Sequence, residues 1–387
     1  MKEYRSSSII ALLLWTAITL LLSIPASAHD HSHDRKIEFP DIPGYRTLKC
    51  DFHQHSVFSD GYVWPNIRVM EALEDGLDAI SITDHLEYQP HKEDIPHPDR
   101  NRSYQIALKA AEGKDLIVVL GAEITRKMPP GHANAIFISD ANKLLADSAM
   151  VAFREARNQG AFIFWNHPNW IAQRPDGIAT LTDMHRMLIK EGLLNGIEIV
   201  NDVTYSEEAL QIALDHHLTI MGTSDIHGLV DWRYKIPEGG HRPVTLVFAK
   251  EKSEAALKDA LLAGRTVVWF DNILAGRSEY LTPLIEQSLT VKNAKTLQTS
   301  RGPSIVQAVT IENNSDADYI LENLSGYSLH SASDVLTIPA HDTTLVEVKT
   351  VEQVTAFDLR FRVLNAVTAP GQHPEVVLKV VIAEAEK

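Results

Sequence analysis

The sequence has a single cysteine in 387 residues and fewer basic than acidic side chains. One cysteine excludes an internal disulfide, and it excludes a zinc site built on several thiolates of one chain. The formal net charge of −15 at pH 7 disfavours binding to nucleic acid without sequence preference, because such binding relies on lysine and arginine contacts to phosphates. The cysteine itself, Cys50, lies in an apolar stretch and is expected to be buried and unreactive.

Long apolar runs are missing except at the amino terminus. Residues 9–22 are apolar, follow Lys2 and Arg5, and precede Ala26-Ser27-Ala28, which is the arrangement of a secretory signal with a small-residue cleavage site. The run is shorter than the roughly 20 residues that cross a bilayer, although an uncleaved membrane anchor is the alternative. We expect residues 1–28 to be a signal peptide and the mature protein to be periplasmic or secreted, without a membrane contact.

Residues 29–46 form a histidine-rich leader in this interpretation. His29, His31 and His33 follow the expected cleavage site. A free amine with a histidine at the third position chelates divalent metals, so the leader is a candidate for metal capture. A disordered polar segment is the alternative, and it is the one that we favour.

Residues 47–280 alternate short apolar runs with amphipathic segments. The runs are rich in valine, isoleucine, leucine and phenylalanine, as in strands buried on both faces of a parallel sheet. Helix signals fall between them: Ser206 is a candidate amino-terminal cap, and Gly76 and Gly264 are candidate carboxyl-terminal glycines. Repeated strand–helix units predict an α/β domain, either a barrel or a doubly wound sheet.

Residues 281–387 have a different texture. Leu359, Phe361 and Val363 alternate with charged residues, and the same period of two recurs in residues 376–382. Turn signals such as Asn313-Asn314-Ser315-Asp316 separate these runs. The pattern predicts a small antiparallel β-sandwich.

The sequence holds 18 histidines, and many fall where a predicted strand ends. His53 and His55 lie two residues apart at the end of the first strand, so their side chains face the same way. Similar groups adjoin other strands, namely Asp84 and His85, Glu123, His132, Asn166 and His167, and Asp225 and His227. Functional residues of parallel α/β domains gather at the carboxyl ends of strands, and histidine is the commonest ligand of transition metals. The pattern therefore predicts a metal site.

These residues resemble the PHP (polymerase and histidinol phosphatase) family of metal-dependent phosphoesterases. The resemblance covers residues 47–270 and rests on motifs in the family's order: Asp51-Phe52-His53-Gln54-His55, Ser59-Asp60-Gly61, Thr83-Asp84-His85, Glu123, Asn166-His167-Pro168 and Asp225-Ile226-His227. It implies a distorted seven-stranded βα barrel. The signal segment and the carboxyl-terminal β domain are most similar to secreted phosphodiesterases of the Sb-PDE type.

By position, the resemblance implies two or three divalent ions per chain. The first would be held by His53, His55, Glu123 and Asp225, the second by Glu123, His132 and His167, and the third by Asp60, His85 and His227. Nitrogen and oxygen ligands without sulfur fit manganese, iron or zinc. Glu198, inside a predicted strand, is expected either to support a ligand from behind or to be a simple buried polar residue.

The expected reaction is attack on phosphorus by a hydroxide that bridges the metals. One of Asp60, His85 and His227 is expected to assist the leaving group, by analogy with the family. At least one basic residue near the mouth is expected to bind phosphate oxygens, from the set Arg126, Lys127, Arg174, Arg233 and Arg242.

The sequence thus predicts an exported metal-dependent phosphodiesterase that acts on small phosphate esters. A phosphomonoesterase of the same fold and a non-catalytic metal-binding protein are the alternatives. A nucleic-acid exonuclease is disfavoured by the acidic charge and by export. The sequence carries no signal for an oligomeric state.

Overall fold

The computed structural model describes residues 35–297 and 305–383 of the chain. The predicted signal peptide, residues 1–28, and the first part of the histidine-rich leader, residues 29–34 with His29, His31 and His33, lie outside these described residues. None of the described helices is long and apolar enough to cross a lipid bilayer.

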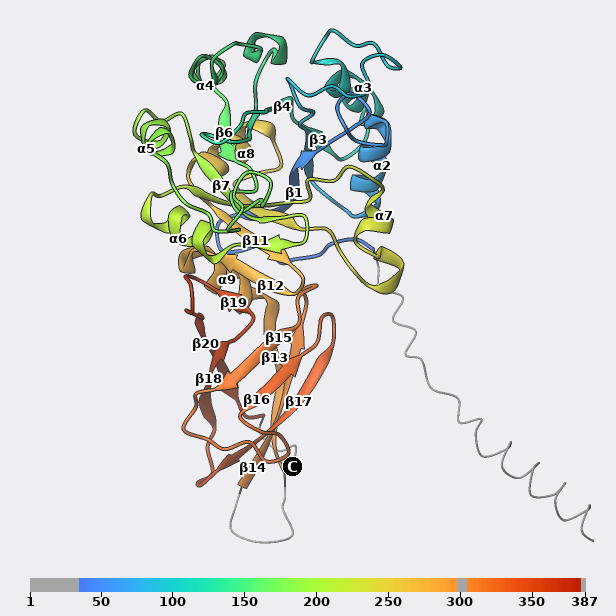
Figure 1. Cartoon of the computed structure of the whole chain (residues 1–387). Helices are drawn as coiled ribbons and strands as arrows, with labels where there is room; N and C mark the ends of the chain where they lie inside the picture. The colour runs from blue at the N-terminus through green and yellow to red at the C-terminus, as the bar shows by residue number, and fades with distance from the viewer. Residues whose placement is uncertain (1–34, 298–304, 384–387) are drawn as a thin grey trace, which may run out of the picture. The chain divides into compact units, whose positions relative to one another are not determined.

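The strands of the α/β domain lie in two sheets (Figure 1). The first sheet has seven strands, in the order β19 (Ala366–Val367), β12 (Ile273–Gly276), β11 (Thr266–Phe270), β10 (Val244–Ala249), β1 (Arg46–Gln54), β2 (Ala79–Ile82) and β3 (Ile117–Val118). The second has β4 (Gly121–Ile124), β5 (Ala133–Ile136), β6 (Phe162–Trp165), β7 (Gly196–Asn201) and β8 (Thr204–Tyr205), with β9 (Thr219–Thr223) also paired to β7.

Backbone bridges join the two sheets at the ends of their strands. His85, after β2, pairs with Glu123 of β4, and Gln54 at the end of β1 pairs with Ile226 after β9. The hydroxyl of Thr245 in β10 donates to the carbonyl of Gly222 in β9 at 2.8 Å. The strands therefore close around a shared interior, and the predicted α/β barrel is confirmed.

The apolar runs predict strands like those of a parallel sheet, but both sheets are mixed. β1 pairs in parallel with β2 but antiparallel with β10, and β4, β5 and β6 form an antiparallel series. Asp271 and Asn272, both with positive φ, make the tight turn that joins β11 to antiparallel β12. Helices cover the outer face of both kinds of strand, so continuous apolar composition reports burial on two faces and does not report strand direction.

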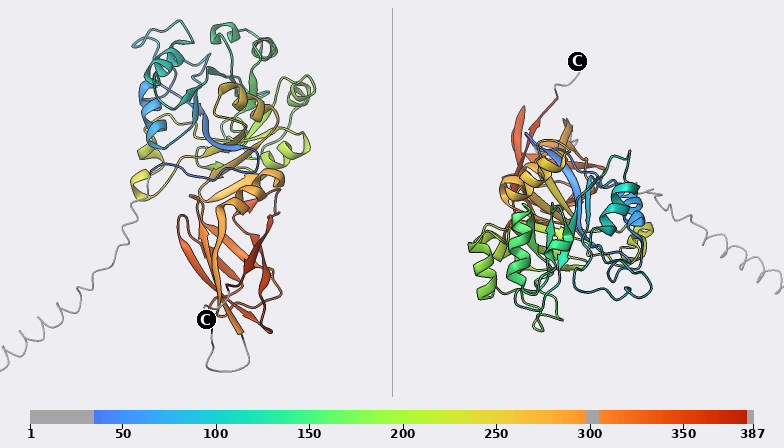
Figure 2. Two further views of the ribbon diagram at one scale, coloured as in Figure 1. Left: turned by 180° about the vertical axis from the view of Figure 1, so that it is seen from behind. Right: turned by 90° about the horizontal axis from the view of Figure 1, so that it is seen from above.

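The helices lie on opposite sides of the barrel. Figure 2 shows the blue to blue-green helices α2 and α3 on one side and the green helices α4 and α5 on the other. The helical segments are α2 (Pro65–Glu74), α3 (Arg102–Ala110), α4 (Ala149–Asn158), α5 (Asp183–Lys190), α6 (Glu207–Asp215), α7 (Val230–Arg233), α8 (Glu254–Leu262) and α9 (Ser278–Ser288), with short 3₁₀ turns at Ala141–Leu144 and Ile236–Glu238.

The predicted helix ends are confirmed. The Ser206 hydroxyl accepts a hydrogen bond from the amide of Ala209 at the start of α6. Gly76 and Gly264 follow α2 and α8 with φ of 67° and 68°, the left-handed conformation that ends a helix without the steric cost of a Cβ.

The carboxyl-terminal strands form two antiparallel sheets, coloured orange to red in Figure 1. One contains β13 (Leu289–Leu297), β14 (Ile305–Asn313) and β17 (Thr343–Thr350), and the other contains β16 (Val335–Ile338), β15 (Tyr319–Asn323), β18 (Ala356–Val363) and β20 (Glu375–Val381). Alternate residues of β18 are buried, as the period of two predicts, and the predicted β-sandwich is confirmed.

The barrel and the sandwich share one hydrophobic core. Val267 and Trp269 of the barrel belong to the same buried cluster as Val309 and Phe361 of the sandwich. β19, from the sandwich segment, extends the first barrel sheet by pairing with β12. The domain boundary predicted at residue 281 falls within α9, which runs through it.

Candidate metal centre

The side chains predicted as metal ligands all lie at one end of the barrel. They come from the carboxyl ends of strands or from the loops that follow or precede them: His53 in β1, His55 and Asp60 after β1, His85 after β2, Glu123 in β4, His132 before β5, His167 after β6, and Asp225 and His227 after β9. Most are buried, and Asp60, His167, Asp225 and His227 are half-buried. The cluster therefore opens toward solvent on one side.

Three overlapping groups within the cluster bring their ligand atoms within 4.8 Å of one another. The first group is His53, His55 and Asp225, the second is His85, Glu123 and His132, and the third is His55, Asp60, His85 and His227. A carboxylate oxygen of Glu123 also lies 3.2 Å from His53 Nε2 and 3.3 Å from His55 Nε2, so Glu123 links the first and second groups.

Several of these ligand atoms are buried without a hydrogen-bond partner among the described residues. They are Asp60 Oδ1, Glu123 Oε1, His132 Nδ1 and Asp225 Oδ1. His132 Nδ1 lies 2.5 Å from Glu123 Oε1, and His55 Nε2 lies 2.9 Å from Asp225 Oδ1, yet neither contact has hydrogen-bond geometry. Buried polar atoms without partners are costly, so such atoms call for a ligand.

The donor set fits divalent cations. Two nitrogen ligands of one tetrahedral ion at 2.0–2.1 Å lie about 3.3 Å apart, and His53 Nε2 lies 3.1 Å from His55 Nε2. Imidazole and carboxylate donors without sulfur are typical of manganese, iron and zinc sites.

Carboxylates and imidazoles in the cluster shift each other's pKa values. Burial opposes a charge on His53, but the carboxylates of Asp225 and Glu198 outweigh burial and raise the pKa of its imidazole well above the usual value. Burial also opposes ionisation of Asp225, and His53 and His55 nevertheless lower the pKa of its carboxyl well below the usual range. The cluster thus stabilises positive charge next to its carboxylates, and divalent cations provide such charge.

Glu198 of β7 fixes the orientation of His53 from behind. Its Oε1 accepts a hydrogen bond from His53 Nδ1 at 2.7 Å, which leaves Nε2 with its lone pair directed at the cluster. Thr223 and Asn201 also donate to this carboxylate, as does the backbone amide of His167. Of the two expectations for Glu198, support for a ligand is the one that the geometry fits.

Asp84, which is not among the predicted ligands, supports them from behind. Its carboxylate accepts hydrogen bonds from the Ser56 amide at 2.7 Å and from the Ser59 hydroxyl at 2.6 Å. Ser59 in turn lies 3.3 Å from His55 Nδ1. The signal was present in Thr83-Asp84-His85, where a buried aspartate directly precedes a predicted ligand.

Comparison with known proteins identifies the family. A family model described as an Ig-like domain (DUF5001) matches residues 289–379. A two-domain protein of Bacteroides vulgatus, described as containing a predicted PHP-like metal-dependent phosphoesterase, is 41% identical with a TM-score of 0.80, over 89% of this chain and 98% of that one. The chain belongs to the family of PHP-like metal-dependent phosphoesterases.

Two more distant similarities concern parts of the chain. An uncharacterized protein of Methanocaldococcus jannaschii is 37% identical over 83 residues, which are 21% of this chain and 36% of that protein. The chain thus spans little more than a third of this curated relative. An amidohydrolase of Chromobacterium violaceum is 15% identical over 46% of this chain and 87% of that one, with a TM-score of 0.33.

The groups in this PHP-like protein differ in part from the ligand sets that the resemblance implied. His85, rather than His167, joins Glu123 and His132, and His55 joins the group of Asp60, His85 and His227. His167 lies beside the second group, with its ring centroid 5.0 Å from that of His132, and is not a member of any of the three groups.

The basic residues predicted to bind substrate have varied surroundings. Arg242 is the clear correction, because it is fully buried and its guanidinium pairs with Asp51 at 3.3 Å and Asp75 at 2.7 Å. It therefore neutralises buried carboxylates behind the strands and does not line the mouth. Arg126 pairs with Glu87, Arg174 donates to the carbonyl of Ile178, and Lys127 is exposed. Arg233 borders the cluster, paired with Asp202.

Cys50 lies buried in β1, as predicted. Burial raises the pKa of its thiol well above the usual value, which keeps the sulfur protonated. Cys50 therefore has no part in the centre.

Proposed function

We propose that the protein is an exported phosphodiesterase that hydrolyses small phosphate esters at a centre of two or three divalent cations. The observation that carries the proposal is the convergence of buried imidazole and carboxylate atoms that lack hydrogen-bond partners among the described residues. Membership of a family of metal-dependent phosphoesterases supports hydrolysis of a phosphate ester as the reaction. Manganese, iron and zinc are the candidate metals.

Divalent cations at such a centre supply acidified water and neutralise charge on phosphoryl oxygens. The residues of the chain orient this chemistry. Glu198 accepts a hydrogen bond from His53 Nδ1. The Thr125 hydroxyl is hydrogen-bonded to His85 Nδ1 at 2.7 Å, and the Asp225 carbonyl accepts from His227 Nδ1 at 2.7 Å. Each contact fixes one ring nitrogen and directs the other into the cluster.

Asp60, His85 and His227 are our candidates for assisting the leaving group. Asp60 Oδ1 lies 3.2 Å from His227 Nε2, and Asp60 Oδ2 lies 3.5 Å from His85 Nε2. The His227 side chain keeps 34% of its surface exposed, so it is within reach of a departing oxygen at the solvent side. A protonated imidazole of His85 or His227 that is not coordinated to a cation can donate its proton to that oxygen.

The activity is tested by comparing bis(p-nitrophenyl) phosphate with p-nitrophenyl phosphate after manganese loading. The proposal expects kcat/KM to favour the diester and expects the paired variant His53→Ala, His55→Ala to lose turnover. A preference for the monoester would make the protein a phosphomonoesterase. Bound metal without hydrolysis of any ester would instead indicate a non-catalytic metal-binding protein.

Export is tested separately. We propose that residues 1–28 are removed and that the mature protein is periplasmic or secreted. Expression of the full chain in a bacterium, followed by fractionation and amino-terminal sequencing, should find a product that begins at His29. A cytoplasmic product that keeps Met1 would contradict export and would leave the proposed reaction unaffected.

A further inference from the structure

Exposed aromatic side chains gather beside the metal centre. Among the residues that the structure describes, every exposed phenylalanine, tyrosine or tryptophan lies on a segment that follows a predicted ligand: Tyr62, Trp64, Tyr88, Trp170 and Trp232. The described sandwich residues expose none. Single exposed aromatic side chains are ordinary, but their restriction to one edge of the barrel indicates a binding surface.

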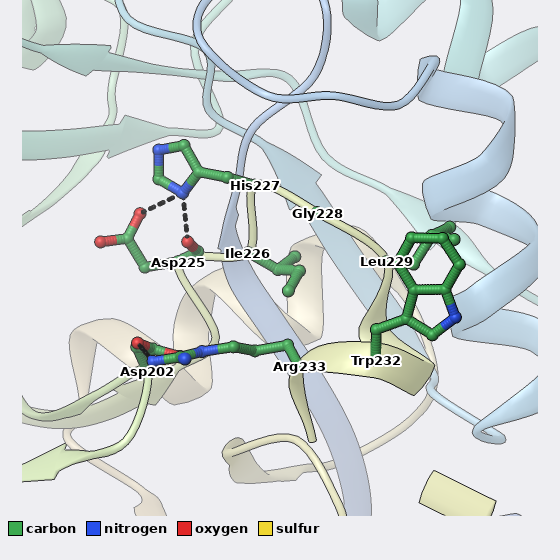
Figure 3. A pocket seen from close by; sticks show the side chains of 8 residues that line it. All are labelled: Asp202, Asp225, Ile226, His227, Gly228, Leu229, Trp232 and Arg233. Carbon is green, nitrogen blue, oxygen red and sulfur yellow. Dashed lines mark hydrogen bonds and ion pairs between the residues drawn. The ribbon is translucent and has the colours of Figure 1, made fainter. Parts of the chain in front are cut away.

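Trp232 is the most exposed of the five, at 80%, and it lines a cavity of about 410 Å³. Figure 3 shows Asp225 and His227 on one side of this cavity and Leu229 and Trp232 on the other. We call it the Trp232 pocket. Because Asp225 and His227 belong to both the pocket and the metal centre, a group attached to a phosphate at the centre reaches the pocket directly.

The charged pair in the pocket has no net charge. Arg233 Nε donates to Asp202 Oδ1 at 2.7 Å, and a second guanidinium nitrogen donates to Oδ2. The hydrogen bond to Asp202 raises the pKa of Arg233, so the guanidinium stays charged and paired. A second phosphate would have to displace the Asp202 carboxylate, whereas a neutral group would not.

Trp232 differs from Trp170 in what its indole touches. Trp170 packs against the rings of His132 and His167, with centroids 5.6 Å and 5.0 Å away, so it covers ligands of the centre. Trp232 has no ring partner among the described residues. Its indole face is thus free to stack on a ligand.

We propose that the Trp232 pocket binds a planar aromatic substituent of the phosphate ester, stacked on the indole of Trp232. The inference rests on the proposed function, since it assumes that the phosphate lies at the adjacent centre. An indole face, the aliphatic side chain of Leu229 and a paired guanidinium all favour a flat, uncharged group. The cavity volume lies within the range of about 300–1,000 Å³ that small-molecule sites occupy.

Binding of two non-hydrolysable ligands tests the pocket. Phenylphosphonate and methylphosphonate share the phosphonate group and differ in the aromatic ring, and calorimetry gives their Kd values for the manganese-loaded protein. We expect about tenfold tighter binding of phenylphosphonate, as stacking on one aromatic side chain provides. Trp232→Ala should reduce this ratio to below about twofold, and Trp232→Phe should retain most of it.

Tyr62→Ala is the matched control, because Tyr62 is 76% exposed at the same edge and does not line the pocket. It should keep the phenyl preference of the wild type. Metal content is measured for each variant, so that loss of the centre is not mistaken for loss of the pocket. A third ligand, uridine 5′-methylphosphonate, then distinguishes a nucleobase from a simple aryl group as the preferred substituent. Tighter binding of this ligand than of phenylphosphonate would indicate a nucleobase.

The outcomes separate the two proposals. Equal binding of the two phosphonates by the wild type, or a preference that Trp232→Ala leaves intact, would overturn the aromatic pocket. If esters are hydrolysed in that case, the proposed function stands without it. A Trp232-dependent phenyl preference in a protein that hydrolyses no ester would support the pocket and contradict the function. Failure of both ligands to bind would contradict both.

Discussion

At the residue scale, Glu198 lies behind the predicted ligand His53 and determines how its imidazole faces the centre. It is fully buried and accepts hydrogen bonds from His53, Thr223 and Asn201, as well as from the His167 amide. The charge on Glu198 strengthens its bond to His53 Nδ1 and makes the opposite nitrogen a better donor to a cation.

Replacing Glu198 with glutamine should therefore weaken metal binding. Glutamine keeps the size of the side chain and loses the charge, so we expect affinity for Mn²⁺ to fall about 10–100-fold. Competition with a fluorescent chelator measures the change. Glu207→Gln, on the exposed first turn of α6, is the control and should bind like the wild type. Equal affinities of the two variants would show that Glu198 is only a buried polar residue.

His185 is a second residue with a measurable role. It is buried against Trp165, its Nε2 donates to the carbonyl of Pro130 at 2.6 Å, and its Nδ1 accepts from the Thr182 amide at the start of α5. Burial lowers the pKa of its imidazole from 6.5 to about 4, although the bond to Pro130 opposes the shift. The folded protein thus holds His185 neutral where the unfolded chain binds a proton.

Above about pH 6.5 His185 is neutral in both the folded and the unfolded chain, so its protonation costs the folded protein no stability. As the pH falls from 6.5 toward 4, the unfolded chain binds a proton that the folded protein does not bind, and the free energy of unfolding decreases. His185→Gln removes the titration and keeps a side chain that caps α5. Between pH 6.5 and 4, the free energy of unfolding of the wild type should fall more steeply than that of the variant, by up to about 1.4 kcal/mol per pH unit. Urea denaturation at several pH values, with chelator present in both, measures this. Parallel curves would be the contrary result.

At the scale of elements, the two barrel sheets meet where β9 crosses β11. The residue of β9 at this crossing is Gly222, which has no side chain. A Cβ at Gly222 would lie 2.3 Å from Cγ1 of Val268 in β11. The Gly222 backbone also exchanges hydrogen bonds with the Thr245 hydroxyl of β10. Close approach of the strands at this point holds β9, and with it Asp225 and His227, against the rest of the barrel.

Gly222→Ala should destabilise the protein by about 1–3 kcal/mol, because the valine beside it cannot move away without disturbing the core. Chemical denaturation measures the loss. Gly326→Ala is the matched control, since a Cβ there meets nothing within 4 Å, and it should change stability by less than about 0.5 kcal/mol. Comparable losses in both variants would contradict close packing of β9 against β11.

The sequence predicts those elements and ligands whose pattern lies within a few neighbouring residues. The period of two in β18 predicts the sandwich, and the histidine and acidic groups at the ends of several strands predict the centre. Arg242 was mispredicted, because its local sequence is the same for a loop at the mouth and a loop behind the strands. The ion pairs with Asp51 and Asp75, which are distant from Arg242 in the chain, place this loop behind the strands. The Trp232 pocket likewise depends on Asp202 of another loop.

At the scale of the whole molecule, the barrel and the sandwich are continuous. They share a hydrophobic core, β19 completes the first barrel sheet, and Asn365 donates to the carbonyls of Asn272 and Asp318. Such an interface is closer to a domain interior than to a mobile contact between domains.

A shared core predicts cooperative unfolding of both parts. Differential scanning calorimetry of the metal-loaded protein should show one transition, with equal calorimetric and van't Hoff enthalpies. Two resolved transitions would contradict the shared core. Addition of a chelator should lower the transition temperature without splitting the peak, because cations bound only to the folded state stabilise the whole molecule.

The central claim is that the imidazole and carboxylate groups at one end of the barrel hold divalent cations. Elemental analysis of the purified protein tests it most directly, with Asp225→Asn to remove one ligand charge and Asp358→Asn, on an exposed position of β18, as the control. We predict two or three equivalents of manganese, iron or zinc in the wild type and in the control, and a loss of at least one equivalent in Asp225→Asn. Less than half an equivalent in the wild type after metal loading, or an unchanged content in Asp225→Asn, would contradict the account.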